Sequence, residues 1–293
     1  MTPDPTPTAA TPPVTVTQWQ PQMPPDNLIF DDGEPLESNR HRIGMNVLIR
    51  SLNQAFAHRN DFFSGGNMFI YFSREQVRNQ DFRGPDFFAV LNIDGSYPRQ
   101  GWVVWEEAGR YPDVIVELMS PSTATIDVTE KKDIYEQTFR TPDYFVYDPF
   151  NADSLQGWHL DANQTYQPLT PNENGQLWCQ QLGLWVGVWQ GTIDREFAPW
   201  LRFYDQAGNV VPLPEEAAQQ QAETAQQQAE TAQQQAETAQ QQAEAAQQRA
   251  TELEQTQRNA IPQLLATGMT VEQVAEILSV SAEFVQQIAN SNQ

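Results

Sequence analysis

The sequence predicts a mixed α/β domain with added β-hairpins, followed by a long heptad helix and a small helical tail. Three observations predict this class. Two segments of the first half carry apolar residues at helical spacing, and four short aromatic and β-branched runs lie between and after them. Nearer the C-terminus, a unit of seven residues repeats. In chain order, the elements of the domain are α-β-β-β-α-β.

Residues 1–29 are rich in proline and threonine, which predicts a disordered arm in front of a folded domain over 30–213. The arm has no apolar stretch of the kind that a signal peptide needs. The single Cys179 has no partner for an intramolecular disulfide, and no run approaches the roughly 18 apolar residues of a membrane span. We therefore expect a cytoplasmic protein that does not contact membranes.

The first predicted helix covers 38–60, with Ser38 as its N-cap. Gly65-Gly66 then breaks the chain, and a strand is expected over 67–73. Two further strands, 86–92 and 113–119, lie on either side of a long loop. The second of them is apolar on both faces apart from its acids, as expected for a central strand of a sheet.

The second predicted helix covers 127–139. Asp127 is placed to cap it, and Glu130 three residues later would complete a capping box. Lys132 is expected to face solvent beside Glu136. Five residues share the opposite, core-facing side by helical spacing: Lys131, Ile134, Tyr135, Thr138 and Phe139.

A fourth strand is expected over 144–147, stopped by Asp148-Pro149. The rest of the domain is rich in Gly and Asn turns, which predicts short strands with hairpins. The expected strands cover 158–160, 177–179 and 184–189, and a hairpin turn is expected at 207–209.

The segment 214–258 contains the unit Ala-Glu-Thr-Ala-Gln-Gln-Gln three times without error. Its alanines fall at positions a and d of a heptad, so the segment predicts a long helix with an alanine seam. Two interpretations stay open. The helix forms a coiled coil that makes the chain a homodimer or higher oligomer, or it is a solvated single helix that acts as a spacer.

Residues 259–293 predict a small helical tail after Pro262, with Thr270 and Ser281 as N-caps. The spacing of its helices is similar to that of a helix-turn-helix. However, no Lys or Arg follows Arg258, and contacts to phosphates need cations. The sequence therefore favours a protein contact over DNA binding for this tail.

The chain carries 38 acidic and 16 basic residues, a net charge of −22. This charge excludes a protein that coats nucleic acid or anionic membranes by electrostatics alone. It leaves room for a local cleft in which a metal ion bridges the protein and a polyanion. Lys131 and Lys132 are the only lysines of the chain.

Asp86 and Glu117 are the first candidates for chemistry. If strands 86–92 and 113–119 pair antiparallel, the start of one lies beside the end of the other, and the two carboxylates become neighbours. Two such oxygens suit Mg²⁺ or Mn²⁺. Lys131, on the core-facing side of the next helix, would orient a water molecule and offset negative charge. The alternative is a structural ion pair without catalysis.

Several short motifs then carry a resemblance to a known family. They are Pro85-Asp86, Glu117-Leu-Met-Ser-Pro-Ser-Thr123, Asp127, Lys131, Tyr135, Pro142-Asp-Tyr-Phe-Val-Tyr-Asp148 and Gly33-Glu-Pro-Leu-Glu-Ser-Asn-Arg-His-Arg42. In this order the sequence resembles the "putative restriction endonuclease" domain family, expanded in cyanobacteria and part of the PD-(D/E)XK nuclease superfamily. The resemblance covers roughly residues 30 to 213.

The resemblance implies a restriction-endonuclease-like core and a metal-dependent endonuclease with DNA as its substrate. It implies Asp86 and Glu117 as metal ligands. Met119 stands where the superfamily pattern places lysine, and Lys131 would fill the migrated position. Glu37 or His41 would be an additional site residue, and Asp127 would support the loop between strand and helix. A catalytically inactive nuclease fold that self-associates remains the alternative.

Overall fold

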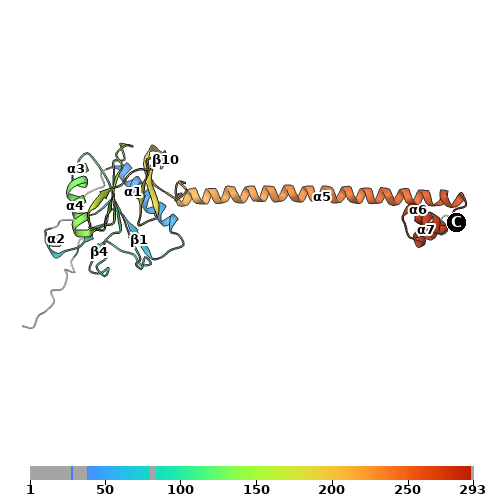
Figure 1. Cartoon of the computed structure of the whole chain (residues 1–293), viewed down its shortest axis with the longest axis horizontal. Coiled ribbons are helices and arrows are strands. Elements are labelled where there is room, and N and C mark those ends of the chain that lie inside the picture. The colour runs from blue at the N-terminus through green and yellow to red at the C-terminus, as the bar shows by residue number, and fades with distance from the viewer. Residues whose placement is uncertain (1–27, 29–37, 80–83, 292–293) are drawn as a thin grey trace, which may run out of the picture. The chain divides into compact units, whose positions relative to one another are not determined.

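The computed structural model describes residues 28, 38–79 and 84–291 (Figure 1). The predicted arm, apart from residue 28, and the candidate residue Glu37 lie outside the described residues. The chain divides into two compact units between Glu216 and Ala217. Among the described residues, all the strands lie in the first unit, and the second consists of helices.

A six-stranded mixed sheet forms the centre of the first unit, in the order β1-β3-β5-β6-β7-β8. Strands β5 and β6 are parallel, and every other neighbouring pair is antiparallel. The predicted antiparallel pairing of the two strands that carry Asp86 and Glu117 is therefore confirmed. The strands are β1 Phe62–Gly65, β3 Phe87–Leu91, β5 Val114–Leu118, β6 Asp143–Tyr147, β7 Gln156–Leu160 and β8 Tyr166–Pro168.

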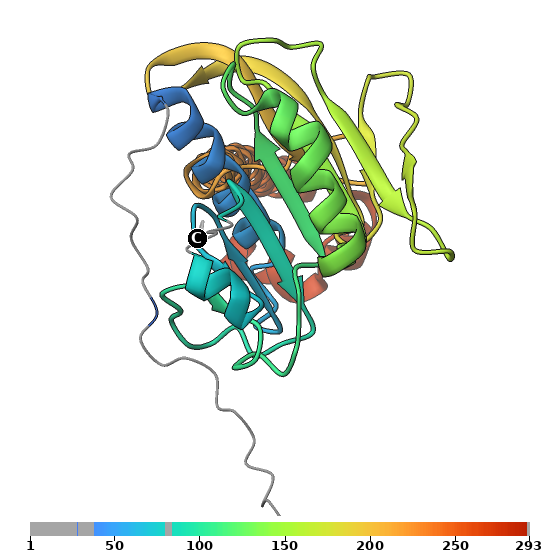
Figure 2. The ribbon, with the colours of Figure 1, turned by 90° about the vertical axis from the view of Figure 1, so that its left-hand side faces the viewer.

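Helices cover both faces of this sheet. Helix α1, Asn39–Ala55, packs Leu48 and Leu52 against one face. The other face is covered by a helical segment that we call helix 124–139, which buries Tyr135 and Phe139. It consists of α3 Ala124–Ile126, the π-helical η1 Asp127–Lys131, α4 Lys132–Ile134 and the π-helical η2 Tyr135–Phe139. Figure 2 shows α1 in blue on one side of the strands and helix 124–139 in green on the other.

The side chains of the central strands alternate between these two layers. Val116 and Leu118 of β5 join the α1 layer, whereas Ile115 joins the layer under helix 124–139. On β3, Phe88 belongs to that second layer as well. Because strand side chains alternate with a period of two, Glu117 and Asp86 also point toward helix 124–139.

A three-stranded sheet extends the α1 layer: β9 Leu177–Cys179, β10 Leu184–Ile193 and β11 Glu196–Tyr204. The sequence-based prediction is right for β9. The strand predicted over 184–189 is shorter than the observed β10, and no strand was predicted at β11. The β10–β11 turn consists of Asp194 and Arg195, both with positive φ. Gly and Asn usually mark such turns, and neither is present here. The predicted turn at 207–209 exists, but it closes only an isolated bridge between Tyr204 and Val210.

Two other predicted elements differ in extent from the structure. Helix α1 begins after Ser38 as expected but ends at Ala55, and turns follow it before β1. The strand expected over 67–73 shrinks to β2, Ile70–Tyr71, followed by α2, Arg74–Asn79. Strand β2 pairs with β4, Trp102–Val103, outside the main sheet. Local propensity identified an extended segment here but not its partner.

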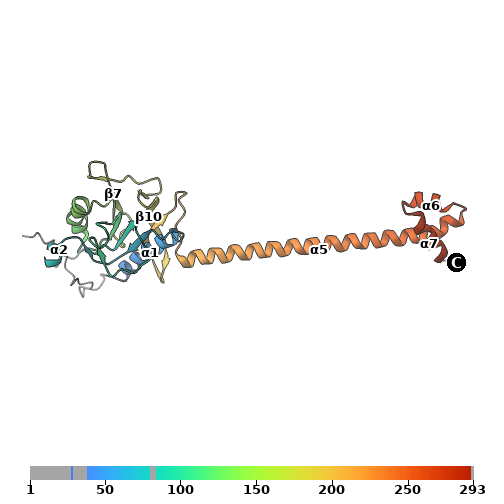
Figure 3. The same ribbon diagram turned by 90° about the horizontal axis from the view of Figure 1, so that it is seen from below.

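Helix α5, Pro214–Ala266, runs without a break through Pro262 (Figures 1 and 3). The predicted boundary at this proline is therefore wrong. Ile261 beside it is fully buried, so packing at this point offsets the backbone hydrogen bond that a proline removes. No helix of the described residues is long and apolar enough to cross a membrane.

Two short helices complete the second unit: α6, Val271–Leu278, and α7, Ala282–Ser291. Both predicted N-caps are confirmed, because Thr270 accepts a bond from the Gln273 amide and Ser281 accepts one from the Phe284 amide. The end of α5 packs with α6 and α7 around a small apolar core. Its fully buried members are Ile261, Val274 and Val285.

Candidate active site

Asp86 and Glu117 lie side by side because of the register of β3 and β5. Phe87 pairs with Val116, so the residue before Phe87 lies opposite the residue after Val116. The Asp86 carboxylate accepts a hydrogen bond from the Leu118 amide at 2.8 Å, which holds it against the end of β5. The sequence-predicted neighbourhood of the two acids is thus present in the fold.

Lys131 reaches the same place from helix 124–139. Its Nζ lies 3.0 Å from Oε2 of Glu117 and 2.8 Å from Oδ1 of Asp127. The Tyr135 hydroxyl donates to the other Glu117 oxygen, Oε1, at 2.7 Å. Glu117 and Asp127 are each 1% exposed, whereas the Lys131 side chain is 21% exposed. The structure therefore brings three of the predicted residues and Asp127 into one buried cluster, which we call the acidic cluster: Asp86, Glu117, Asp127 and Lys131.

The charges of the acidic cluster do not balance, because three carboxylates face one ammonium group. Burial raises the pKa of Asp86 well above its ordinary value, and the charge of Glu117 adds to this. Burial also raises the pKa of Glu117, although Lys131 opposes the shift. For Lys131, burial alone would lower the pKa, but Glu117 and Asp127 outweigh it and the net shift is upward. Lys131 therefore stays protonated at neutral pH, while the acids favour an added positive charge.

The donor set fits a divalent cation. Oε2 of Glu117 and Oδ1 of Asp127 are buried without a well-aligned hydrogen bond and rely on the nearby Lys131 ammonium. Within 38–79 and 84–291, no three or more His, Cys, Asp or Glu side chains are arranged to hold a metal ion between them. Mg²⁺ does not need such a cage, because it keeps several waters and binds through one or two carboxylates. Asp86 and Glu117 supply that number.

Asp127 has a different place from the one the sequence predicts. It is not an N-cap, because helix 124–139 begins three residues earlier and Asp127 has helical dihedrals. Its side chain pairs with Lys131, one π-helical turn further along, instead of closing a capping box with Glu130. The preceding loop is held by Ser120 and Thr123, since the Ser120 amide donates to the Thr123 hydroxyl at 3.0 Å.

His41, on the first turn of α1, contacts the chain just beyond the end of β5. Its Nε2 is 3.3 Å from the carbonyl oxygen of Met119, two residues beyond Glu117. Its Nδ1 is 2.7 Å from the hydroxyl of Ser38, which also accepts the His41 backbone N–H. The imidazole thereby ties the N-terminus of α1 to the end of β5.

Lys132 and Thr138 correct the predicted faces of helix 124–139. The Lys132 ammonium lies 5.2 Å from the centre of the Trp158 ring rather than beside Glu136, whose carboxylate accepts the Tyr166 amide. Thr138, expected on the buried side, is exposed. The two π-helical turns shift the residues that follow them relative to a regular α-helix, so the spacing of an ideal helix misplaces them.

Tyr135 and Tyr144 are site residues whose contacts sequence reasoning missed. Tyr135 donates to Glu117, and the Tyr144 hydroxyl donates to the backbone carbonyl of Asp127 at 2.8 Å. Tyr135 follows Lys131 by four residues, so helical spacing alone places both on one side of the helix. That spacing was the available signal for Tyr135. Tyr144 could be placed only once its pairing neighbours were known.

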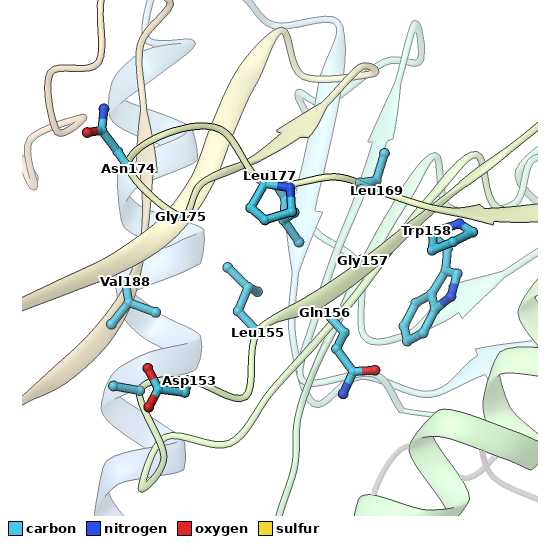
Figure 4. Close-up of a pocket in the computed structure, with 13 residues that line it drawn as sticks. Asp153, Leu155, Gln156, Gly157, Trp158, Leu169, Asn174, Gly175, Leu177 and Val188 are labelled. Atoms are coloured by element: carbon cyan, nitrogen blue, oxygen red, sulfur yellow. The ribbon is translucent and has the colours of Figure 1, made fainter.

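A surface pocket of about 580 Å³ lies elsewhere in the first unit, around β7 to β10 (Figure 4). Leu155, Leu169, Leu177 and Val188 supply its apolar part, polar groups contribute about equally to its lining, and it contains no member of the acidic cluster. Figure 4 shows Gln156 projecting from β7 toward the green helix and Leu155 projecting to the other side. Because its polar groups do not converge, the pocket is a weaker candidate for chemistry than the acidic cluster.

The sequence model of the family described as "Uma2: Putative restriction endonuclease" matches residues 16–194. The chain belongs to this family. The Uma2 match includes helix α1, the whole six-stranded sheet and all the described members of the site. It confirms the restriction-endonuclease-like fold class that the motifs predict.

Among solved structures, a putative nuclease belonging to DUF820 from Anabaena variabilis is similar to part of the chain. The similarity covers 50% of this chain and 76% of that one, with 13% sequence identity and a TM-score of 0.37. No protein with a curated description matches the chain.

Proposed function

We propose that this Uma2 protein is a metal-dependent endonuclease that hydrolyses phosphodiester bonds, with DNA as its substrate. The observation that carries the proposal is the acidic cluster, in which Asp86 and Glu117 lie on adjacent strands with Lys131 against Glu117. Two hard carboxylates beside one lysine suit hydrolysis of a phosphodiester. Membership of the Uma2 family supports the same reaction class.

Asp86 and Glu117 would hold Mg²⁺ or Mn²⁺, and the bound ion would polarise the phosphodiester and acidify a water molecule. The protein's own residues prepare the place for it. The Leu118 amide fixes the Asp86 carboxylate, and the Tyr135 hydroxyl fixes the Glu117 carboxylate. The second oxygen of Glu117 faces the Lys131 ammonium at 3.0 Å. The acids are thereby oriented before any ligand arrives, which reduces the reorganisation needed for binding.

Lys131 would orient the attacking water and offset negative charge on the phosphate. Its raised pKa keeps it protonated, so it acts as a hydrogen-bond donor and a cation rather than as a general base. Asp127 supports this role because its Oδ1 lies 2.8 Å from the Lys131 ammonium, which also pairs with Glu117. The Tyr144 bond to the Asp127 carbonyl then anchors that part of the helix to β6.

Cleavage of labelled DNA tests the proposal. We expect Mg²⁺-dependent cleavage by the wild-type chain and a loss of at least about 100-fold for Asp86→Asn and for Lys131→Met. Asp113→Asn is the matched control, since Asp113 lies on the same face just before β5 but binds the Leu91 amide and Arg110. The control should cleave like the wild type. Equal residual activity in all four proteins would contradict the proposal.

A second function, self-association without catalysis, is favoured by the surface of α5. Its side chains are exposed over nearly the whole repeat. The Glu residues of the repeat stand at heptad position b, and each accepts a bond from a Gln four residues earlier, as in Gln226 to Glu230 and Gln233 to Glu237. The alanine seam is therefore flanked by neutral Gln at e and g, so two copies could pair without repulsion of charge.

Sedimentation of the full-length chain tests this second function. We expect a dimer or higher oligomer for the wild type and a monomer after Ala225→Glu and Ala232→Glu, which place charges in the seam. Thr224→Glu and Thr231→Glu add the same charge outside the seam and should leave the mass unchanged. A monomeric wild type, or equal masses for both double variants, would exclude association through the heptads.

A further inference from the structure

Phe150 lies at the same end of the sheet as the acidic cluster. Strands β5 and β6 are parallel, with Leu118 opposite Tyr147, so their carboxyl ends meet at one edge. Glu117 is at the end of β5, and Phe150 is three residues beyond the end of β6. The aromatic ring therefore follows β6 at the edge of the sheet where the proposed chemistry takes place.

Side-chain contacts connect the two places. The His41 imidazole touches the carbonyl of Met119, two residues after Glu117, and its centre is 6.1 Å from that of the Phe150 ring. The Phe150 amide donates to the Asp148 carboxylate at 2.8 Å, which fixes the turn that carries the ring. Phe150 is thus held in a defined place beside the end of β5.

Arg40 covers the ring from one side. Its guanidinium carbon is 4.3 Å from the ring centre, and the group is oriented by Glu196 at 2.7 Å and by the Pro149 carbonyl at 3.4 Å. Even so, Phe150 is 56% exposed, whereas Phe145 on β6 before it is fully buried. A large apolar ring that is supported by a cation and still open to solvent is the arrangement of a stacking platform.

The charge of the protein favours a base over a phosphate as the group that binds here. Arg40 is already paired with Glu196, so the cation that covers the ring is neutralised and is not free to bind the phosphates of a long duplex. Stacking on an aromatic ring needs no free cation and accepts any base. The ring can stack only a base that is not already stacked between two neighbours in a duplex.

We propose that Phe150 stacks an unpaired nucleobase next to the scissile phosphate, so that the preferred substrate is single-stranded or locally unpaired nucleic acid. This inference rests on the proposed nuclease function. Arg40 and His41 act as positioning residues that hold the ring, and the substrate reaches the acidic cluster through the backbone of the stacked nucleotide.

Binding of a fluorescein-labelled oligothymidylate of about 20 nucleotides tests the inference, with Ca²⁺ in place of Mg²⁺ and the full-length chain. We expect Phe150→Ala to weaken binding roughly 5- to 150-fold, the range for one stacked base. Phe150→Tyr keeps the ring and should bind like the wild type. Tyr97→Ala is the matched control, because Tyr97 is 45% exposed and lies in the loop after the far end of β3.

A 2-aminopurine placed in turn at each position of the strand gives a readout that a purely structural role would not change. Stacking should quench its fluorescence at one position with the wild type and not with Phe150→Ala. Equal affinity and equal quenching for both proteins would overturn the inference, as would equal losses with single-stranded and duplex probes. If the wild type cleaves duplex DNA while Phe150→Ala changes nothing, the nuclease function stands and the stacking role falls. If the wild type neither binds nor cleaves any probe, both fall.

Discussion

Two buried acidic sites lie at the six-stranded sheet, one around Asp143 and one formed by the acidic cluster, and they differ in how their charges are satisfied. At the start of β6, the fully buried Asp143 contacts His159 Nδ1 at 2.7 Å, the Gln181 amide at 2.8 Å and the Cys179 thiol at 3.4 Å. At the end of β5, Glu117 and Asp127 share one lysine, and Asp86 adds a third carboxyl group whose pKa is raised by burial and by the charge of Glu117. The first group is complete, whereas the second favours a further cation. Burial alone therefore does not identify a functional acid, but an unbalanced charge does.

The largest expected effect concerns the complete group. Asp143→Ala should lower the free energy of unfolding by about 3 kcal/mol, because it removes the acceptor of several buried donors at once. Urea denaturation followed by tryptophan fluorescence measures this change. The stabilisation that Mg²⁺ produces should remain in this variant, because Asp143 is not one of the proposed ligands. A loss of less than about 1 kcal/mol would show that the partners of Asp143 do not stabilise its buried charge as this comparison requires.

A smaller loss is expected for the unbalanced group when its cation is removed. Lys131→Met should lower the free energy of unfolding by about 2 kcal/mol without metal, since it leaves Glu117 and Asp127 buried with no counter-charge. The expected loss of stability is smaller than for a fully buried ion pair, because the Lys131 side chain is partly exposed. Adding Mg²⁺ should restore part of the stability. A Lys131→Met protein that is more stable than the wild type would mean that the acids are neutral in the fold.

The smallest effect has the opposite sign. Asp86→Asn should raise the free energy of unfolding by about 1 kcal/mol near pH 8 without metal, because it removes one of three crowded negative charges. Asn can still accept the Leu118 amide, so the hydrogen bond is kept. The gain should be lost when Mg²⁺ is added, because the metal stabilises only the wild-type acid pair.

The pH dependence of that gain follows from the raised pKa of Asp86. The folded state holds the proton more tightly than the unfolded state, whose carboxyl has its ordinary pKa of 3.8. Asp86 therefore costs no stability below that value, and its cost grows as the pH rises through the folded-state pKa. The difference between Asp86→Asn and the wild type should be larger near pH 8 than near pH 5. A gain that is the same at both values would contradict the upward shift.

The sequence predicted the parts of this site that depend on regular strand geometry. Asp86 and Glu117 could be placed together because alternation and antiparallel pairing are the same in every sheet. Lys131 could be placed on the core-facing side of a helix for a similar reason. The roles of these residues as metal ligands and water-orienting group remain predictions.

Other parts of the fold depend on interactions that no local pattern encodes. The sequence around Asp127 is compatible with a helix cap and with an interior helical position. Only the observed start of the helix at Ala124 shows that the residue is interior. The turn at Asp194–Arg195 contains no Gly or Asn, and Arg195 has a positive φ that its residue type does not predict. Pro262 normally ends a helix, but the packing of Ile261 at the end of α5 keeps this one intact. In each case tertiary contacts override the local preference.

The most direct test of the unbalanced acidic cluster is anomalous diffraction from crystals of the wild-type chain grown with Mn²⁺. A Mn²⁺ ion should lie between Asp86 and Glu117, about 2.1 Å from a carboxylate oxygen of each, and it should be absent in Asp86→Asn crystals. A peak at another site, or none beside Glu117 at saturating Mn²⁺, would contradict the account.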